Sequence, residues 1–340
     1  MSAFKIGLTR DLLTASGQPS FGAAPLEILD AAKDVLQWEY MPESVAEITP
    51  DQAARYDAIY VNSPKVTAAS VARGDCRLAI VARHGVGYDS VDVNALTKAG
   101  ILLTNTPFAV RRPVATMAIT YVLALAQKML IKDRLTRAGN WTQRTDHMGR
   151  GLTGRTLGIV GAGGTGQETL RLVRGFDMRL LAADPYADAA KIEALGAKLV
   201  PLPTLLRESD FVVLTVLLND ETRHLINADA LALMKPTAYL INVARGPVVD
   251  EPALIQALKA KRIAGAGLDV FEQEPIAPDN PLLSMEQVIV SPHSLCWTDE
   301  CFHAIASDGL TSVVDVARSK RPAHLVNPAA LNVPRWAHMR

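Results

Sequence analysis

The stretch GIVGAGGTG, residues 158–166, decides the fold of this chain. It completes an apolar strand that begins near Arg155, and a helical pattern follows it directly. A glycine-rich turn between a buried strand and a helix is typical of the first βα unit of a doubly wound parallel sheet. In such a unit Gly161 permits the tight turn, Gly163 lets a ligand approach the backbone, and Gly166 lets the helix pack on the strand.

Strand and helix patterns alternate on both sides of this turn. Strands are expected at residues 4–10, 57–62, 78–84, 101–107, 155–161, 178–185, 210–218, 238–245, 264–270 and 287–293. Helices are expected at residues 25–39, at 114 to about 136, at 166–176, at 189–196 and from 297 to about 320. Because strands separated by helical patterns form parallel sheets with helices on their faces, the sequence predicts an α/β fold.

The expected helix after Pro113 is apolar on more than one face, which indicates burial. We expect this helix either to cross between two domains or to be buried in a partner subunit. Its uncharged run, residues 113–127, is shorter than the roughly 20 residues of a membrane span. No membrane partner is therefore expected.

Composition and charge narrow the class further. The 340 residues are 49% hydrophobic and 21% charged, as in a globular protein of about two domains. Basic and acidic residues number 35 each, so we expect no attraction to nucleic acid. The cysteines, Cys76, Cys296 and Cys301, lack metal-ligand spacing, which predicts no metal site and favours a reducing compartment. Without a recognisable signal peptide, we expect a cytoplasmic protein.

The glycine turn predicts a dinucleotide site. A pyrophosphate there would meet the unpaired N–H groups at the start of the helix. Asp184 ends the next strand, where a carboxylate can accept hydrogen bonds from the ribose hydroxyls of NAD and would repel the 2′-phosphate of NADP. The alternative is a glycine-rich turn with an N-capping aspartate nearby and no ligand.

Three polar residues follow the later strands. Arg245 and His293 end two of the expected strands, and Glu274 comes shortly after a third. In open α/β sheets ligands bind beyond the carboxyl ends of strands, so these side chains are candidates for chemistry at a nicotinamide. Histidine can take the proton of an alcohol, a carboxylate can stabilise its charged form, and arginine can bind a substrate carboxylate. Each residue alone could equally be structural.

With these residues placed, the sequence resembles the D-isomer-specific 2-hydroxyacid dehydrogenases, which include 3-phosphoglycerate dehydrogenase and hydroxypyruvate/glyoxylate reductases. The resemblance covers nearly the whole chain. Its matching pieces are ARHGVGYDSVDVNAL (82–96), TNTP (104–107), GIVGAGGTG (158–166), INVARGPVVDEPAL (241–254), GLDVFEQEP (267–275) and SPHS (291–294). The resemblance implies an NAD-dependent oxidoreductase that transfers a hydride between nicotinamide and C2 of a small 2-hydroxy or 2-keto acid.

The resemblance also implies the role of each matched residue. Arg245 orients the substrate, His293 is the acid/base, and Glu274 supports it. Backbone N–H groups around Val86 and Gly87 hold the substrate carboxylate. The residues implied to bind the cofactor are Gly161, Gly163, Gly164, Thr165, Gly166, Asp184, Thr215, Val243, Ala244 and Asp269, with Asp269 at the nicotinamide carboxamide.

The family fold implies two doubly wound domains. A flavodoxin-like substrate-binding domain comprises residues 1–111 and 297–340, and a Rossmann NAD-binding domain, residues 112–296, is inserted into it. The resemblance implies that substrate binds between the domains and that two chains form a homodimer.

The chain departs from the family pattern near residue 110. Phe108 replaces a usual glycine, and Val110 and Thr116 replace Asn and Glu. Together with the pair Arg111-Arg112, they could reshape the substrate cleft. A helix start with solvated arginines is the simpler interpretation.

Other positions leave their roles open. Trp297 either closes over the substrate or packs in a domain interface, and His84 could face the substrate or be incidental. The last dozen residues are expected to be loosely ordered or to clasp a neighbouring chain.

Two alternatives use the same scaffold: an NAD-sensing, corepressor-like binding protein and a phosphite-type dehydrogenase. Formate enzymes of this fold usually carry Gln at the position of Glu274, which counts against formate.

Overall fold

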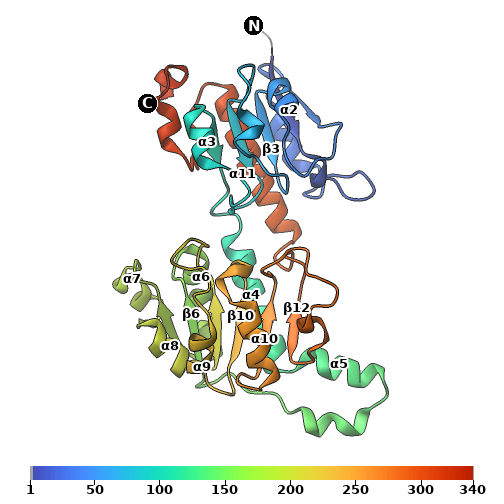
Figure 1. Ribbon diagram of the computed structural model, residues 1–340, viewed down its shortest axis with the longest axis vertical. Helices are drawn as coiled ribbons and strands as arrows, with labels where there is room; N and C mark the ends of the chain where they lie inside the picture. Colours follow the sequence, from blue (N-terminus) through green and yellow to red (C-terminus); the bar gives the residue numbers. More distant parts are fainter. Residues whose placement is uncertain (1–2, 340) are drawn as a thin grey trace. The chain divides into compact units, whose positions relative to one another are not determined.

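The computed structural model describes residues 3–339, which form two compact units, each built on one parallel sheet (Figure 1). Unit 1 holds the described residues up to Val110 together with those from Trp297 onward, and unit 2 is Arg111–Cys296. Both sheets carry helices on their faces, so the predicted α/β class is confirmed.

Unit 1 contains a five-stranded sheet in the order β2-β1-β3-β4-β5, which is the flavodoxin-like order. Its strands are β1 (Phe4–Leu8), β2 (Leu36–Tyr40), β3 (Ala58–Val61), β4 (Ile80–Arg83) and β5 (Leu102–Thr104). Its α-helices are α1 (Glu27–Asp30), α2 (Pro50–Arg55), α3 (Val93–Lys98) and α11 (Asp299–Ala317). Buried Phe302 and Leu310 of α11 pack on one face of the sheet, so the core of unit 1 needs both of its chain segments.

The C-terminal tail packs into the core of unit 1. Trp336 is buried, and its indole N–H donates to the carbonyl of Gly100 at 2.7 Å. Asn327 accepts from the N–H of Leu103 at 2.8 Å, which ties the tail to β5. The expectation of a loosely ordered tail is wrong for the described residues, because its apolar side chains pack within the same unit.

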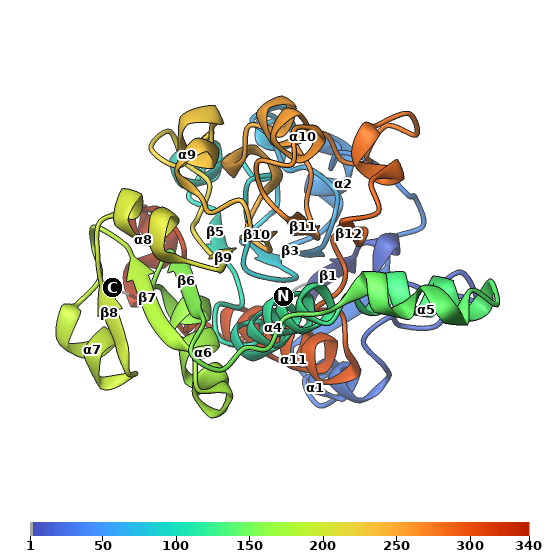
Figure 2. The same cartoon turned by 90° about the horizontal axis from the view of Figure 1, so that it is seen from below.

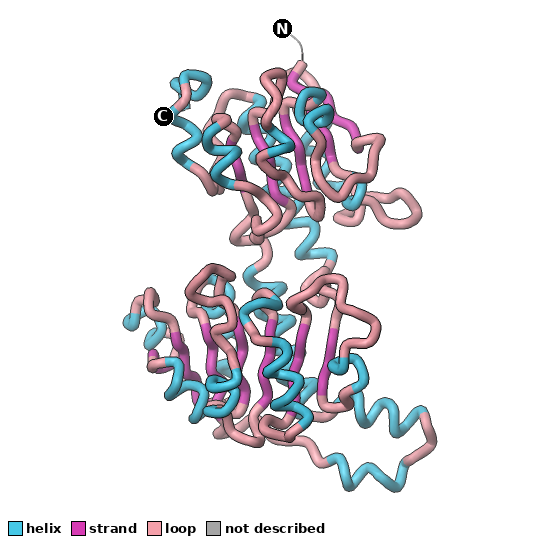
Figure 3. The backbone as a smooth tube through the Cα atoms, viewed as in Figure 1, coloured by secondary structure: helices cyan, strands magenta, loops and turns pink. Residues whose placement is uncertain are grey.

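Unit 2 contains a seven-stranded sheet in the order β12-β11-β10-β9-β6-β7-β8, which is the Rossmann order extended by one strand. Figure 3 shows the strands of this sheet side by side, with helices against them. Its strands are β6 (Thr156–Val160), β7 (Arg179–Ala183), β8 (Ala197–Leu199), β9 (Phe211–Leu214), β10 (Tyr239–Asn242), β11 (Gly265–Leu268) and β12 (Val288–Val290). Its α-helices are α4 (Arg111–Ala126), α5 (Met129–Arg137), α6 (Gly164–Val173), α7 (Ala189–Ala194), α8 (Leu202–Glu208), α9 (Ala228–Leu233) and α10 (Glu251–Lys259).

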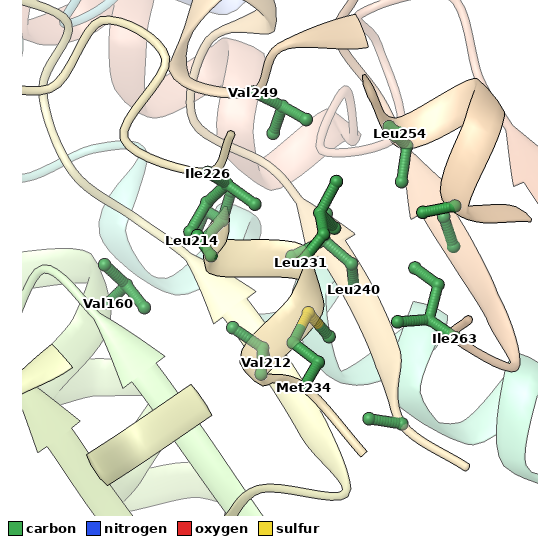
Figure 4. Close-up of a cluster of buried hydrophobic side chains, with 14 of the residues drawn as sticks. Val160, Val212, Leu214, Ile226, Leu231, Met234, Leu240, Val249, Leu254 and Ile263 are labelled. Atoms are coloured by element: carbon green, nitrogen blue, oxygen red, sulfur yellow. The ribbon is translucent and has the colours of Figure 1, made fainter. Parts of the chain in front are cut away.

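Alternate residues along the strands of unit 2 pack into two hydrophobic cores, one on each face of the sheet. Val212 and Leu240 pack with Leu231 of α9 and other residues of the first core (Figure 4). Val213 and Ile241 belong to the second core, with residues of α4 and α6, and Figure 2 shows α4 and α6 across the sheet from α9 and α10. Burial on both faces explains why these strands are continuously apolar.

Two element predictions are wrong. Residues 36–39 were expected in a helix but belong to β2, an edge strand whose alternating exposure gives a weak apolar signal. The single helix expected from 114 to about 136 is two helices, α4 and α5, bent by 57° with Lys128 left-handed (φ 49°) between them.

No single helix among the described residues is long and apolar enough to cross a membrane. Taken together, the bent pair α4 and α5 meets the length and composition of a membrane span. Most of α4, however, is buried in unit 2.

Candidate active site

The turn between β6 and α6 has the geometry of a ligand-binding loop. Gly161 adopts a φ of 92°, and a Cβ on it would lie 2.7 Å from the backbone nitrogen of Val216. A Cβ on Gly166 would overlap the carbonyl oxygen of Gly161. Gly163 caps α6 without a side-chain acceptor, and the first turn of α6 has no acidic residue. The N–H groups at this helix start are therefore left without a side-chain partner in the turn.

A pocket of about 810 Å³ opens beside this turn. Its lining includes Gly161, Gly163, Asp184, Thr215, Val216 and Leu217. These residues follow β6, β7 and β9, and β6 and β9 are neighbours at the point where the strand order reverses. Ligands of doubly wound sheets bind at this switch point, and the volume suits a nucleotide-sized molecule.

Asp184 is fixed at the edge of the pocket. Its Oδ2 accepts the N–H of Ala162 at 2.8 Å, and its Oδ1 accepts the N–H of Tyr186 at 2.9 Å. Thr215 donates its hydroxyl to the carbonyl of Gly161 at 2.6 Å, which fastens the turn to β9. A negative charge and a rigid glycine turn thus face one cavity, as an adenosine ribose followed by a pyrophosphate requires.

Glu274 and His293 form a hydrogen-bonded pair in unit 2. Glu274 Oε2 lies 2.7 Å from His293 Nδ1, and its Oε1 accepts the N–H of Phe271 at 3.0 Å. Burial raises the pKa of Glu274, but hydrogen bonds from His293 and Phe271 and the charges of His293 and Arg245 outweigh it and lower this pKa overall. An ionised Glu274 accepts a hydrogen bond from the Nδ1–H group of His293, which leaves Nε2 of His293 for proton transfer.

Arg245 follows β10 in a tightly held segment. Asn242, almost fully buried, accepts the N–H of Ala244 at 3.0 Å and donates to the carbonyl of Arg245 at 2.9 Å. A Cβ on Gly246 would overlap the carbonyl of Phe271, so glycine lets this segment lie against the one that carries Glu274. Arg245 thus directly precedes a residue that touches the segment carrying Glu274, and its charge lowers the pKa of Glu274.

Asp269 holds the turn that bears His293. The Asp269 side chain is 1% exposed, and its Oδ1 accepts the N–H groups of Ser294 at 3.0 Å and Leu295 at 3.1 Å and the hydroxyl of Ser291. Its carbonyl accepts the N–H of His293 at 2.8 Å, and His293 has a left-handed φ of 51°. Burial raises the pKa of Asp269, and these hydrogen bonds oppose the rise.

Sequence reasoning missed three residues that support this site. Ser291 lies 2.5 Å from the hydroxyl of Tyr121 on α4, so Tyr121, Ser291 and Asp269 form one hydrogen-bonded chain. Asn242 is the third. The available signals were a tyrosine in a largely apolar helix, a serine directly before Pro292-His293, and an asparagine ending a buried strand.

The remaining predicted residues have different surroundings. Val243 and Ala244 are buried between β10 and Arg245. Val86 and Gly87 lie in a half-buried loop of unit 1 after β4, where Asn105 donates to the carbonyl of Val86 at 2.9 Å.

The residues whose roles were left open also have definite places. His84 is 5% exposed and lies 2.5 Å from the hydroxyl of Tyr60, so it is a core residue of unit 1. Trp297 and Phe108 are exposed aromatics of unit 1, against Phe302 and His324 respectively. No cluster of three potential metal ligands occurs in residues 3–339.

The family model for the D-isomer specific 2-hydroxyacid dehydrogenase NAD binding domain matches residues 119–294, which lie in unit 2. The chain belongs to this family. It is an NAD-dependent 2-hydroxyacid dehydrogenase, an oxidoreductase acting on CH–OH donors. The implied family, fold class and cofactor are thus confirmed.

Individual members of the family align over most of the chain. Glyoxylate reductase of Korarchaeum cryptofilum is 44% identical over 76% of this chain and 78% of its own length. Glyoxylate reductase of Thermococcus onnurineus is 39% identical over 88% of this chain and 91% of its own. The crystal structure of a glyoxylate reductase from Paecilomyes thermophila superposes with a TM-score of 0.83 at 29% identity, covering 96% of this chain and 99% of that one.

Proposed function

We propose that this dehydrogenase reduces a small 2-keto acid, with glyoxylate as the first candidate, and that Arg245, Glu274 and His293 are its catalytic residues. The observation that carries this is the 2.7 Å pair of His293 and Glu274, which lies near Arg245 in the dinucleotide-binding unit. The glyoxylate reductases among the relatives support the substrate class.

The side chains perform the proton and charge work of the reaction. When bound, NADH would supply the hydride that C2 receives. His293 donates a proton from Nε2 to the C2 oxygen during reduction and takes it back during oxidation. Ionised Glu274 stabilises the charged imidazole through Nδ1, and Arg245 binds the substrate carboxylate and polarises the adjacent carbonyl.

The cofactor and substrate assignments outside this trio are part of the same proposal. Gly161, Gly163, Gly164, Thr165 and Gly166 bind the pyrophosphate, and Asp184 binds the ribose hydroxyls. Thr215, Val243, Ala244 and Asp269 complete the cofactor site. Unit 2 is the NAD-binding domain, and unit 1, through Val86 and Gly87, is the substrate-binding domain.

We further propose a cytoplasmic homodimer that binds neither nucleic acid nor membranes. The support for the dimer is the segment formed by α5 and the 3-10 helix Trp141–His147, which extends from unit 2 as an arm (Figure 2). Neither helix has a buried residue, and the exposed apolar side chains along the arm and just beyond it are Met129, Leu130, Trp141 and Met148. Apolar side chains gathered on a protruding segment mark a surface for a protein partner.

The activity is tested by following NADH oxidation with a panel of 2-keto acids: glyoxylate, hydroxypyruvate, pyruvate, phenylpyruvate, 2-oxoglutarate and 3-phosphohydroxypyruvate. We expect turnover with glyoxylate or another small acid, and faster turnover with NADH than with NADPH because of Asp184. Binding of NADH without turnover of any acid would contradict the substrate class. Light scattering of the purified chain gives the oligomeric state, and a monomer would contradict the dimer.

A further inference from the structure

The side chain of Arg111 lies against the dinucleotide turn. Arg111 is the first residue of α4, and Gly164 is the first residue of α6. A Cβ on Gly164 would lie 2.8 Å from Cζ and 2.9 Å from Cδ of Arg111. Gly164 is helical and is not among the glycines with positive φ, so its backbone conformation does not call for glycine. Because Gly164 has no side chain, the guanidinium of Arg111 can occupy the space beside it.

The positive charge of Arg111 is unusual beside the N-terminus of a helix, here that of α6. The N-terminus of an α-helix is positive, so acidic side chains are favoured there and basic ones are disfavoured. The first turn of α6 has no acidic residue, and Gly163 supplies no side-chain acceptor. A guanidinium and unpaired helix N–H groups therefore converge on one turn, and such a combination attracts a phosphate.

The neighbouring arginine behaves differently. Arg112 has 54% of its side chain exposed and pairs with Glu168 of α6 at 3.0 Å. Glu168 also pairs with Arg171 at 2.7 Å. This ion pair links Arg112 to the side of α6, and Arg112 takes no part in the turn itself.

We propose that Arg111 is a further cofactor-binding residue whose guanidinium contacts the pyrophosphate of NAD at the start of α6. Its planar set of N–H donors suits two phosphate oxygens better than an ammonium would. In this assignment Gly164 and Arg111 work as a pair, in which the glycine opens the space and the arginine from another helix fills it. Arg111 thus acts on the cofactor, and not on the substrate cleft.

The test measures binding and needs no substrate. We compare the Kd of NADH, from its fluorescence, in the wild type, Arg111→Gln and the matched control Arg112→Gln. Losing one charge-assisted contact should weaken NADH binding by about tenfold or more in Arg111→Gln and little in Arg112→Gln. Binding of adenosine, which lacks phosphate, should not change. The Kd of the wild type should also rise more steeply with salt than that of Arg111→Gln.

A double-mutant cycle tests the pairing with Gly164. Gly164→Ala should displace the guanidinium and weaken NADH binding, and adding it to Arg111→Gln should cost much less than it does in the wild type. Equal Kd values for Arg111→Gln and Arg112→Gln would overturn the proposal. So would a raised KM for the keto acid with an unchanged NADH Kd, which would place Arg111 at the substrate. If Arg111→Gln fails to fold, Arg111→Lys must still show weaker NADH binding than the wild type.

Discussion

His84 in unit 1 and His293 in unit 2 both follow a parallel strand, yet their surroundings differ completely. His84 is packed against the rings of Tyr60 and Phe302, and burial with the nearby charge of Arg83 lowers its pKa to about 3. His293 is more exposed and lies 2.7 Å from a carboxylate whose pKa is lowered. A strand-end histidine can therefore be either a neutral core residue or an acid/base, and the partner at Nδ1 distinguishes the two.

The substitution His293→Asn should have the largest effect and tests whether His293, unlike His84, acts as the acid/base. Because the proton on the C2 oxygen then has no side-chain donor, we expect kcat to fall by about 10²–10⁴-fold. His224→Asn is the matched control, since His224 also pairs with a glutamate, Glu272, at 2.5 Å. Steady-state rates of NADH oxidation measure the effect. Rates of His293→Asn near those of the control would refute the catalytic role.

Glu274→Gln should have the next largest effect. The amide accepts a hydrogen bond but cannot stabilise a charged imidazole, so we expect kcat to fall by about 10–100-fold. Since the pKa of Glu274 lies below its ordinary value of 4.5, the wild type should show no loss of rate from this group above that pH. Glu272→Gln should keep the wild-type rate and pH profile. An equal fall of kcat in both variants would mean that the charge of Glu274 has no specific role in catalysis.

His84 should influence stability and its pH dependence. Its folded pKa of about 3 is below its ordinary value of 6.5, so the unfolded chain binds a proton that the folded chain does not between these values. Stability from this group is complete above pH 6.5 and falls by about 1.4 kcal/mol for each pH unit below it. His84→Leu should remove this slope in urea unfolding at pH 7, 6 and 5. An unchanged slope would show that His84 is not buried neutral.

The smallest effect is expected for Ser291→Ala. This change removes the hydrogen bonds to Asp269 and Tyr121 and loosens the turn that carries His293. One such bond is worth about 1 kcal/mol, so we expect kcat to fall by about fivefold with little change in KM. Ser291→Thr, which keeps the hydroxyl, should restore the rate. A loss of thermal stability with an unchanged kcat would make the chain of bonds structural only.

Much of this fold follows from local signals in the sequence. The central strands of both sheets are buried on both faces, so they stand out as apolar runs, and polar residues directly after them indicate the site. The edge strand β2 was missed because its alternating exposure gives a weak apolar signal, and β8 because it has only three residues and is partly exposed. The break after α4 was missed because the left-handed residue there is Lys128, and lysine gives no local signal for a turn.

Site residues could be predicted from the sequence only where the residue type itself indicates the chemical role. Arg245, Glu274 and His293 could be named from their types, their positions after strands and the family resemblance. Tyr121 and Arg111 could not, because each comes from α4 and reaches a segment more than fifty residues away. Tertiary packing creates such partners, and no periodicity within α4 encodes them.

Unit 1 is made of two separate chain segments, and this has a consequence for how the chain folds during synthesis. All of unit 2 is one continuous stretch, whereas the sheet of unit 1 is made first and its covering helix α11 last. Domains usually fold in the order in which they leave the ribosome. Here the order is reversed: the nucleotide-binding unit can be complete while the first hundred residues still expose the apolar face that α11 will cover. A released chain that ends at Cys296 should therefore bind NADH and also bind chaperones.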